Sequence, residues 1–448
     1  FTAFKSGIRA GDQLIGVNNI NVEGKRSDEI SNLLKGQAGT SLKVKLIKAG
    51  QTSSIELSLK REEIKTKSVP YYGVLPNSET GYIKLTAFTE NCSNEVKEAL
   101  LDLKNKNCKN IILDLKGNLG GLLIEAVNIV NLFVDKGQEI VYTKGKTSNW
   151  DKSYLSVNNP IDIKIPLAVL VDENSASASE IVSGALQDLD RAIIIGKRTY
   201  GKGLVQQTKP LIYNSQIKIT VAKYYIPSGR CVQALDYSNK NEEGRVEKVP
   251  DSLITAFKTK KGRIVYDGAG VMPDIKSSEE KLNTVLISLL SKFHIFNYAT
   301  NYALKTPTII DASNFKLTDE DYNDFMTYIK TQDYSYKSNI EIELEKLKKE
   351  AEEEQSFGLI KLEYETLLNK LIQDKKDDLL KHKTEICKEL ETEIVSRYYF
   401  QKGRIESNIK NDKDIYQAKL LLSDSFKTET ILSKIEKPTK PFNIKKKF

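Results

Sequence analysis

The stretch IPLAVLVDENSASASEIVSGALQDL, residues 165–189, predicts a buried strand that leads directly into a helix. Its first part, IPLAVLVD, is an almost unbroken apolar run, which is typical of a strand covered on both faces. Its last part, SEIVSGALQDL, has the apolar spacing of a helix. Three serines lie at alternate positions between them, Ser175, Ser177 and Ser179. A hydroxyl at such a junction lies close to free backbone N–H groups and to the positive end of the helix dipole.

The segments on either side repeat this alternation of strands and helices. We expect further strands at GYIKLTAF, NIILDLKGN and RAIIIGK, and further helices at SNEVKEALLDLKNK and LLIEAVNIVNLFV. Ser93 is the expected N-cap of the first of these helices, and Val96, Leu100 and Leu103 share its apolar face. Strands that alternate with helices indicate an α/β layer rich in parallel strands, which we place at residues 65–278.

The first 64 residues have a different pattern, that of a compact β-rich module with one helix. GDQLIGVNNINVEG predicts two strands joined by an Asn-Asn turn, and TSLKVKLIKAG followed by QTSSIELSLKR predicts a second strand pair. The helix is expected at RSDEISNLLKG, where Gly36 ends the apolar spacing.

Residues 279–448 predict a third, mainly helical domain in which glycine is rare. Segments such as IELEKLKKEAEEEQ, KLEYETLLNKLIQDKKDDLLKH and KTEICKELETEIVSRYYF read as charged helices, and the last has an apolar stripe of Ile386, Leu390 and Ile394. We expect a long protruding hairpin here. Charged helices with narrow apolar stripes suit packing against a partner or a second copy of the chain, so a homo-oligomer is one expectation.

The bulk composition is that of an ordinary globular protein of two or three domains. The 448 residues are 40% hydrophobic and 29% charged. The net charge of +8 is a mild excess over 68 basic and 60 acidic residues, and we expect no nucleic-acid partner. No apolar run is long enough to span a bilayer. The four cysteines have no metal-ligand spacing and are interpreted as mostly buried thiols.

Two further segments suggest chemistry at the serine junction. DLKGNLGG, residues 114–121, puts a glycine pair after a buried strand, where backbone can approach a ligand and direct N–H groups at an anion. GKRTYGKGLVQQ, residues 196–207, presents Lys202 between two glycines, and desolvation in a cleft would favour its neutral form. Taken singly, serines at a helix entry are usually caps, and a loop lysine is usually solvated. Both histidines, His294 and His382, lie far downstream, so histidine is not the expected base.

In this order, DLKGNLGG, SASASEIVSGALQD, GKGLVQQ and GVMPDI resemble the motifs of carboxyl-terminal processing peptidases, serine proteases with a Ser–Lys dyad. The resemblance covers residues 1 to about 280 and implies a crotonase/ClpP-like α/β protease core. It implies that Ser177 is the nucleophile, that Lys202 is its base and that Gln206 orients the lysine. The implied oxyanion hole comprises the N–H of Ala178 and one N–H from the pair Gly120 and Gly121. Such chemistry requires no cofactor and no metal.

The chain departs from the family motif at two positions, with Leu119 in place of a common proline and Lys116 in place of a common arginine. Both glycines remain, so we expect activity to survive.

The N-terminal segment FKSGIRAGDQLIGVNNINVEG resembles a PDZ domain, with Ser6 in place of the usual alanine. A PDZ domain captures the C-terminal carboxylate of a peptide as an added strand. The chain begins after the usual carboxylate-binding loop, so we expect this PDZ-like module, residues 1–64, to be incomplete. The helical remainder resembles the C-terminal extension of some bacterial members.

The resemblance also implies partners and a location. We expect protein or peptide substrates with accessible C-termini and, in some cases, an adaptor. Relatives work in the bacterial periplasm or at the cell envelope, so we expect the same location, with the export signal outside the given chain.

Two other functions compete with this hypothesis. A non-catalytic PDZ-containing scaffold on the same fold would not need the dyad, whereas Ser177, Lys202 and Gln206 are all present here. A crotonase-type enzyme acting on acyl-CoA would need an adenine-nucleotide pocket, and nothing in the sequence suggests one. The PDZ-like module also argues against it.

Overall fold

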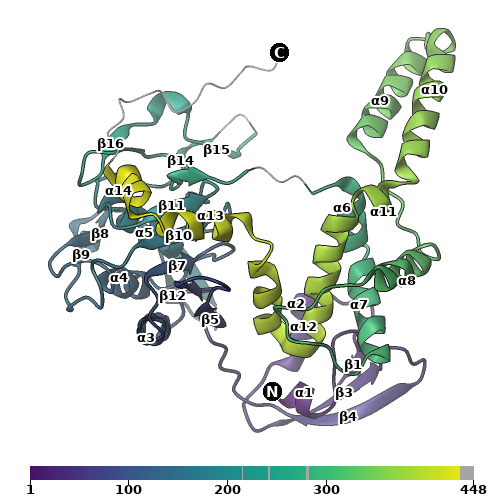
Figure 1. The fold of residues 1–448 in the computed structure, drawn as a ribbon, viewed down its shortest axis with the longest axis horizontal. Coiled ribbons are helices and arrows are strands. Elements are labelled where there is room, and N and C mark those ends of the chain that lie inside the picture. Colours follow the sequence, from purple (N-terminus) through teal and green to yellow (C-terminus); the bar gives the residue numbers. More distant parts are fainter. Residues whose placement is uncertain (214, 241–242, 279–281, 434–448) are drawn as a thin grey trace. The chain divides into compact units, whose positions relative to one another are not determined.

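The computed structural model describes residues 1–213, 215–240, 243–278 and 282–433, and Figure 1 shows the chain as a ribbon. The chain forms two compact units, one made of Phe1–Lys65 with Glu279–Asn411, the other of Thr66–Ser278 with the segment from Asp412 on. The sequence assigned everything after residue 278 to one helical domain. The structure differs from this division, because residues 412–433 lie with the α/β unit.

The α/β unit is built on a six-stranded sheet with strand order β18-β11-β10-β7-β6-β5. Its strands are β5 (Tyr71–Val74), β6 (Thr80–Lys84), β7 (Asn110–Asp114), β10 (Leu167–Val171), β11 (Ile193–Gly196) and β18 (Ile275–Lys276). Every neighbouring pair is parallel except β5 and β6, which are antiparallel. The predicted parallel-rich α/β layer is therefore confirmed.

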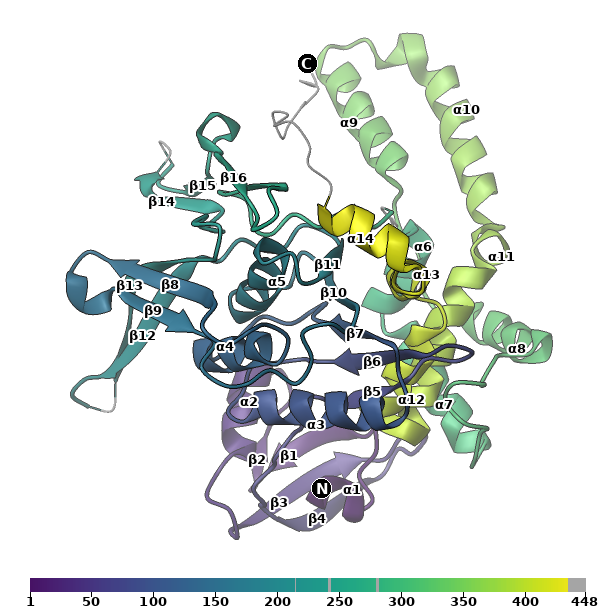
Figure 2. The same cartoon turned by 60° about the vertical axis from the view of Figure 1, so that its left-hand side comes forward.

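Helices cover both faces of this sheet (Figure 2). The helices α3 (Cys92–Asn105), α4 (Leu123–Asn131) and α5 (Ala178–Asp188) share one apolar core with the strands, whereas α13 (Lys413–Leu422) and α14 (Ser425–Ser433) pack on the strands from the C-terminal segment. Val169 of β10 belongs to the first core, and the alternation of side chains along a strand directs Leu170 to the opposite face. Both are fully buried, which explains the unbroken apolar run.

A second, antiparallel sheet in the same unit was not identified from the sequence. Its order is β12-β13-β8-β9, formed by β12 (Leu204–Pro210), β13 (Gln216–Tyr225), β8 (Glu139–Gly145) and β9 (Lys152–Leu155). Two short hairpins, β14 (Leu235–Lys240) with β15 (Val246–Lys248) and β16 (Ala256–Lys258) with β17 (Ile264–Tyr266), complete the unit. Much of β12 and of the first half of β13 is exposed on both faces, so the sequence shows no alternation of apolar residues there.

The N-terminal module has the predicted strands and helix. They are β1 (Gln13–Val17), β2 (Ile20–Asn21), α2 (Ser27–Leu34), β3 (Ser41–Ile47) and β4 (Ser54–Lys60), preceded by a short helix α1 (Thr2–Lys5). The four strands form an antiparallel sheet of order β2-β1-β3-β4. Asn18 and Asn19 connect β1 to β2 with φ angles of 46° and 67°, as a two-residue hairpin turn requires.

The helical part of the same unit follows the predicted pattern with one difference. Its helices are α6 (Thr284–Ser291), α7 (His294–Lys305), α8 (Asp319–Ile329), α9 (Asn339–Glu353), α10 (Phe357–Lys375), α11 (Asp378–Lys381) and α12 (Lys383–Ile409). The stripe of Ile386, Leu390 and Ile394 is fully buried, as expected. The segment KLEYETLLNKLIQDKKDDLLKH is divided between α10 and α11 instead of forming one helix. None of the helices that the structure describes is both long and apolar enough to cross a bilayer.

The helices α9 and α10 form the expected hairpin, and Figure 1 shows its two helices side by side. Lys375 near the end of α10 pairs with Glu341 near the start of α9, which closes the base of the hairpin.

The predicted cap of α3 was wrong. Asn91, with φ 71°, is the residue that precedes the helix, and Ser93 lies inside its first turn. The N–H of Ser93 donates to the carboxylate of Glu125 in α4 at 2.8 Å. A buried carboxylate from the neighbouring helix thus satisfies a first-turn donor, so no serine cap is needed there.

Candidate active site

The strand-to-helix junction distinguishes the three serines. The hydroxyl of Ser175 donates to the Leu115 carbonyl at 2.9 Å, and that of Ser179 donates to the Asn118 carbonyl at 2.8 Å. Both of these serines are fully buried. Ser177 is half-buried and is the one of the three that lines a pocket. The other two hydroxyls therefore have structural roles.

The backbone of Ser177 is strained. It is the N-cap of α5, with φ 56° and ψ −111°. A non-glycine residue with positive φ costs roughly 1–3 kcal/mol, and such residues cluster at functional sites. The backbone strain therefore indicates a functional role for Ser177 independently of any sequence motif.

The pocket beside Ser177 has a volume of about 470 Å³ and is formed by segments that lie far apart in the sequence. Its lining comprises Leu119, Gly120, Gly121, Leu122, Leu123, Ser177, Ala178, Ile181, Lys202, Leu204, Val205, Gln206, Lys218 and Tyr224. All six residues that the resemblance implies for catalysis and the oxyanion hole are among them. The fold thus brings the serine junction, the glycine pair and the lysine loop to one cavity.

The glycine pair lies directly against the serine junction. Gly120 has φ 96°, and a Cβ at this position would lie 2.6 Å from the Ala176 carbonyl oxygen and 2.9 Å from the Ser177 Cβ. Gly121 has φ 150°, and a Cβ there would collide with the Phe88 carbonyl. Leu119 stands where the family commonly has proline and is 72% exposed. The replacement of proline by leucine therefore removes no buried contact.

The two glycines differ in what their N–H groups do. The N–H of Gly120 donates to the Asn118 side-chain oxygen at 2.9 Å. Within the part of the chain that the structure describes, the N–H groups of Gly121 and Ala178 have no acceptor. Asn118 also accepts the Ala176 N–H at its carbonyl, so it fixes the glycine loop against the serine junction. The N–H groups of Gly121 and Ala178 are therefore available to donate hydrogen bonds to an anion in the pocket.

The carboxylate of Glu180 connects the serine junction to the lysine loop. Its Oε2 accepts the N–H of Ser177 at 2.9 Å and the N–H of Lys202 at 2.8 Å. Its Oε1 accepts the N–H of Gly201 at 2.7 Å and the hydroxyl of Thr199 at 2.6 Å. Burial raises the pKa of Glu180 above its ordinary value although these four donors oppose the shift. The sequence analysis missed Glu180, but the Ser-x-x-Glu spacing of a capping box was visible.

Tyr224 of β13 makes a second connection between the same two segments. Its hydroxyl lies 2.6 Å from the Lys202 carbonyl oxygen and 3.1 Å from the Ser177 carbonyl oxygen, and it shares its proton between them. Burial, with the charge of Glu180, raises the pKa of Tyr224 well above its ordinary value, so the hydroxyl remains a donor. Both backbones are therefore held from the N–H side by Glu180 and from the carbonyl side by Tyr224.

The two candidate dyad residues, Ser177 and Lys202, line the same pocket. No hydrogen bond joins the Ser177 hydroxyl to the Lys202 amine, both of which belong to described residues. Gln206 lies beside a β-bulge between Val205 and Gln206, and its amide nitrogen is 3.5 Å from the Thr220 hydroxyl. Catalytic hydrogen bonds are often long without substrate, so this geometry is compatible with a dyad.

The described cysteines and acidic residues form neither a disulfide nor a metal site. All four thiols are free, and Cys92 and Cys108 are buried. Burial raises the pKa of Cys92 to about 12 and that of Cys387 to about 11, which keeps both as unreactive thiols. No group of three or more metal-binding side chains is arranged to hold an ion among the residues with described positions.

Two protein families match the chain. Residues 79–237 match "Peptidase family S41", and residues 285–422 match "Probable PDZ-protease, C-terminal helical domain". The carboxy-terminal processing protease CtpA of Bacillus subtilis is 37% identical over 230 residues, 51% of this chain and 48% of that protein. A probable CtpA-like serine protease of Staphylococcus epidermidis is 36% identical over 310 residues, 67% of this chain and 57% of that protein.

Among solved structures, the photosystem II D1 C-terminal processing protease is 28% identical, with a TM-score of 0.37, covering 63% of this chain and 67% of that one. The chain spans about half the length of the curated relatives it matches, 48% and 54% of the first two. Residues 79–237 are thus similar to peptidase family S41, and about half of the chain is similar to carboxy-terminal processing proteases.

Proposed function

We propose that the chain is a serine endopeptidase of the C-terminal processing type that works through an acyl-enzyme, with Ser177 as nucleophile and Lys202 as general base. The observation that supports this most directly is the shared pocket, in which both residues and the glycine pair meet. The double connection by Glu180 and Tyr224 is the second support, because it fixes the separation of the two backbones.

In the proposed reaction, the neutral amine of Lys202 accepts the proton of the Ser177 hydroxyl as the oxygen attacks the scissile carbonyl. The N–H groups of Ala178 and Gly121 hold the oxyanion, because the Gly120 N–H is already used by Asn118. The Lys202 ammonium then gives its proton to the leaving amine. The neutral amine then takes a proton from a water molecule that attacks the acyl-enzyme, and the resulting ammonium returns a proton to the Ser177 oxygen as the acyl group leaves.

The described arrangement is, in this proposal, a resting state. Substrate binding would bring the Lys202 amine to the Ser177 hydroxyl and release Gln206 from Thr220 to orient the amine. The strain in the Ser177 backbone is of the kind that a preorganised nucleophile retains.

The remaining expectations form part of the same proposal. The substrates are proteins with accessible C-terminal tails, captured by the PDZ-like module and delivered in some cases by an adaptor, in the periplasm or at the cell envelope. The α9–α10 hairpin mediates homo-oligomerisation. Support for the last point comes from its exposed leucines, since Leu359 and Leu362 are 84% and 74% exposed.

The test is the cleavage of an unstructured protein such as reduced casein. Ser177→Ala and Lys202→Ala should each lower the rate by at least about a thousandfold while the circular dichroism spectrum stays unchanged. Lys209→Ala, which alters an exposed lysine of β12 outside the pocket, is the matched control and should cleave at the wild-type rate. Full activity in either dyad variant would refute the assignment, and no cleavage by the folded wild-type chain would favour the non-catalytic scaffold.

A further inference from the structure

A β-hairpin of the α/β unit ends in exposed apolar side chains. It is formed by β12 and the first half of β13, and Figure 2 shows it extending away from the six-stranded sheet. Leu211, Ile212 and Tyr213 lie at its tip and are 52%, 76% and 94% exposed. The N–H of Leu211 donates to the Ser215 carbonyl at 2.8 Å, which closes the turn. The tip therefore presents three large apolar side chains to solvent.

Tyr213 has an unusual backbone conformation for an aromatic residue. Its φ angle is 56°, in the left-handed region that glycine and asparagine adopt at the least cost. A turn made of glycine and asparagine would keep the hairpin and remove this exposed apolar surface. Backbone strain together with exposure indicates that the aromatic side chain has a function at the tip.

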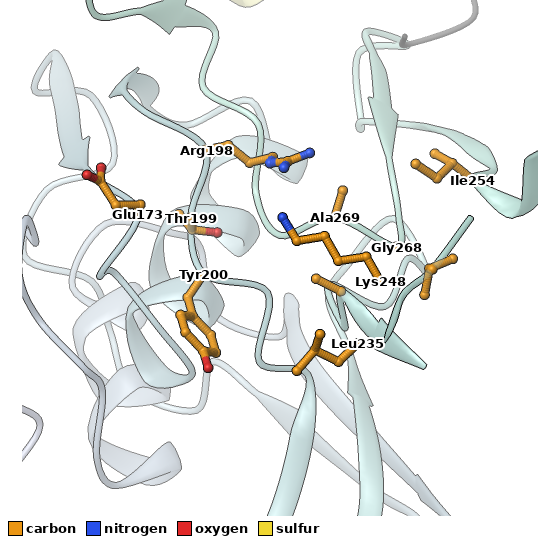
Figure 3. A pocket seen from close by; sticks show the side chains of 11 residues that line it. Glu173, Arg198, Thr199, Tyr200, Leu235, Lys248, Ile254, Gly268 and Ala269 are labelled. Carbon is orange, nitrogen blue, oxygen red and sulfur yellow. The ribbon is translucent and has the colours of Figure 1, made fainter. Parts of the chain in front are cut away.

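The tip projects beyond the rest of the described α/β unit. The strand β8 pairs with residues 222–225 of β13, whereas the described residues 216–220 pair with β12 alone. The tip residues line neither the pocket at Ser177 nor the separate pocket at Thr199 and Tyr200 that Figure 3 shows. A two-stranded hairpin is only marginally stable in water, so a partner that covers the tip would also stabilise the hairpin.

The hairpin is basic as well as apolar. Residues 204–225 contain three lysines and no aspartate or glutamate. Lys209 lies opposite Ile217, and Lys218 lies opposite Thr208, so the two lysines occupy successive levels behind the tip and opposite faces of the hairpin. Both lysines are exposed. No carboxylate of the hairpin itself neutralises these cations.

An apolar tip with cations behind it is complementary to the surface of an anionic bilayer. In such a surface the aliphatic side chains enter the acyl region, the tyrosine lies at the level of the head groups, and the lysines reach the phosphates. Ile217 and Ile219, each 42% exposed, extend the apolar surface along the face that carries Lys209. A second copy of the chain is a less suitable partner, because each copy has a net charge of +8.

We propose that the hairpin of β12 and β13 inserts residues 211–213 into the surface of an anionic phospholipid bilayer, with Lys209 and Lys218 on the lipid phosphates. The same two strands carry Gln206 and Tyr224 to the pocket at Ser177, so the contact holds that pocket close to the membrane surface. The inference goes beyond the proposed peptidase function. Vesicle binding is measured without cleavage, so either proposal can fail without the other.

Flotation of the full chain with lipid vesicles tests the proposal. The chain should bind vesicles made of equal parts phosphatidylglycerol and phosphatidylcholine at least about tenfold more strongly than vesicles of phosphatidylcholine alone. The double variant Ile212→Ser with Tyr213→Asn should lower the partition coefficient on the anionic vesicles at least about tenfold. Two apolar side chains are lost in this variant, whereas asparagine tolerates the positive φ.

Two further variants separate the contributions to binding. Lys209→Gln should lower the partition coefficient on anionic vesicles about fivefold, because one cation near the lipid surface is lost. Val157→Ser removes a side chain that is 62% exposed elsewhere in the same unit, and this matched control should bind as the wild type does. Circular dichroism checks that each variant is folded.

A fluorescent side chain reports the insertion directly. Tyr213→Trp adds a second tryptophan to Trp150, the single one of the chain. Its emission should shift to shorter wavelength on addition of anionic vesicles and should be quenched by lipids with brominated acyl chains. The wild-type emission should show neither change.

Three results would overturn the proposal. One is the absence of flotation of the wild-type chain with anionic vesicles. The second is an equal partition coefficient for the wild type and the Ile212→Ser, Tyr213→Asn variant, which would assign membrane binding to another segment. The third is self-association of the wild type without vesicles that the double variant lacks, which would assign the tip to a contact between copies of the chain.

Discussion

A substitution of Glu180 should disturb the positions of Ser177 and Lys202 while leaving substrate binding unchanged. Each of its oxygens accepts two donors, so Glu180→Gln places an NH₂ group against donors of the loop or of Ser177. We expect kcat to fall about 10- to 100-fold with little change in KM, because in the proposed mechanism the displaced groups act in the chemical step. The free energy of unfolding should also fall by about 2 kcal/mol.

Steady-state kinetics with a fluorogenic peptide, together with urea unfolding, check this prediction. Glu98→Gln, an exposed position of α3, is the control and should match the wild type in both measurements. A wild-type kcat in Glu180→Gln would show that the carboxylate does not position the dyad.

Gly120 offers a second test on the scale of one residue, with a control three positions away. Gly117 and Gly120 both have positive φ, but a Cβ at Gly117 would meet nothing within 4 Å, whereas a Cβ at Gly120 would collide with the Ala176 carbonyl oxygen and the Ser177 Cβ. Gly117→Ala should cost only the strain of its φ, about 1 kcal/mol of stability, and retain activity. Gly120→Ala should lose most of its activity, measured as cleavage of the same fluorogenic peptide. Equal activity of the two variants would contradict the close approach.

Among the elements, α13 is attached to the sheet by charges at its N-terminus. Lys116, which replaces the common arginine, pairs with Asp412 and lies 3.6 Å from Asp414. Burial acts to lower the pKa of Lys116, but the charges of Asp114, Asp412 and Asp414 raise it, so the lysine stays charged. Asp412 also caps α13 by accepting the Asp414 N–H at 2.9 Å.

Two variants of Asp412 separate these roles. Asp412→Asn retains the cap and loses the charge, whereas Asp412→Ala loses both and should be about 1 kcal/mol less stable than Asp412→Asn. Hydrogen exchange of residues 413–422 should increase in both variants and more in Asp412→Ala. Exchange that stays at the wild-type level in both would show that apolar packing alone holds α13 on the sheet.

The end of β7 predicts a pH dependence of stability. Burial acts to raise the pKa of Asp114, but the charges of Lys84 and Lys116 and the hydrogen bond from Tyr82 lower it below its ordinary value of 3.8. The stabilisation from this carboxylate is therefore present above that value and is lost as the pH falls through the folded-state pKa. In urea unfolding, Asp114→Asn should be less stable than the wild type at pH 7, with a gap that narrows toward pH 3. A difference in the free energy of unfolding that does not change with pH would contradict this role of Asp114.

The elements also show what the sequence could and could not predict. The strands β7, β10 and β11 were predictable because each is apolar along its length, and α5 because its start and spacing are clear. The packing of α13 on β10 was not predictable from the sequence, because a charged amphipathic helix can pack against many different surfaces. The set of residues at the pocket was predicted by resemblance, whereas Glu180 and Tyr224 act through backbone contacts that only the tertiary structure reveals.

For the whole molecule, the proposed homo-oligomer depends on the α9–α10 hairpin. Residues 343–373 can be replaced by a short glycine–serine linker, because the Lys375–Glu341 pair closes the hairpin at its base. We expect light scattering to give an oligomer for the full chain and a monomer for this variant. The same oligomeric state in both would assign the contact to another surface, and a monomeric full chain would refute the proposal.

The most direct measurement asks whether a primary amine at position 202 is what activates Ser177. Lys202→Cys should be inactive, and alkylation with 2-bromoethylamine, which rebuilds an amine of nearly lysine length, should restore cleavage of reduced casein to a measurable fraction of the wild-type rate. Alkylation with iodoacetamide should restore nothing, and the wild type treated with either reagent controls for the other four cysteines. Wild-type activity in Lys202→Cys before alkylation, or equal recovery with the two reagents, would contradict the Ser–Lys mechanism.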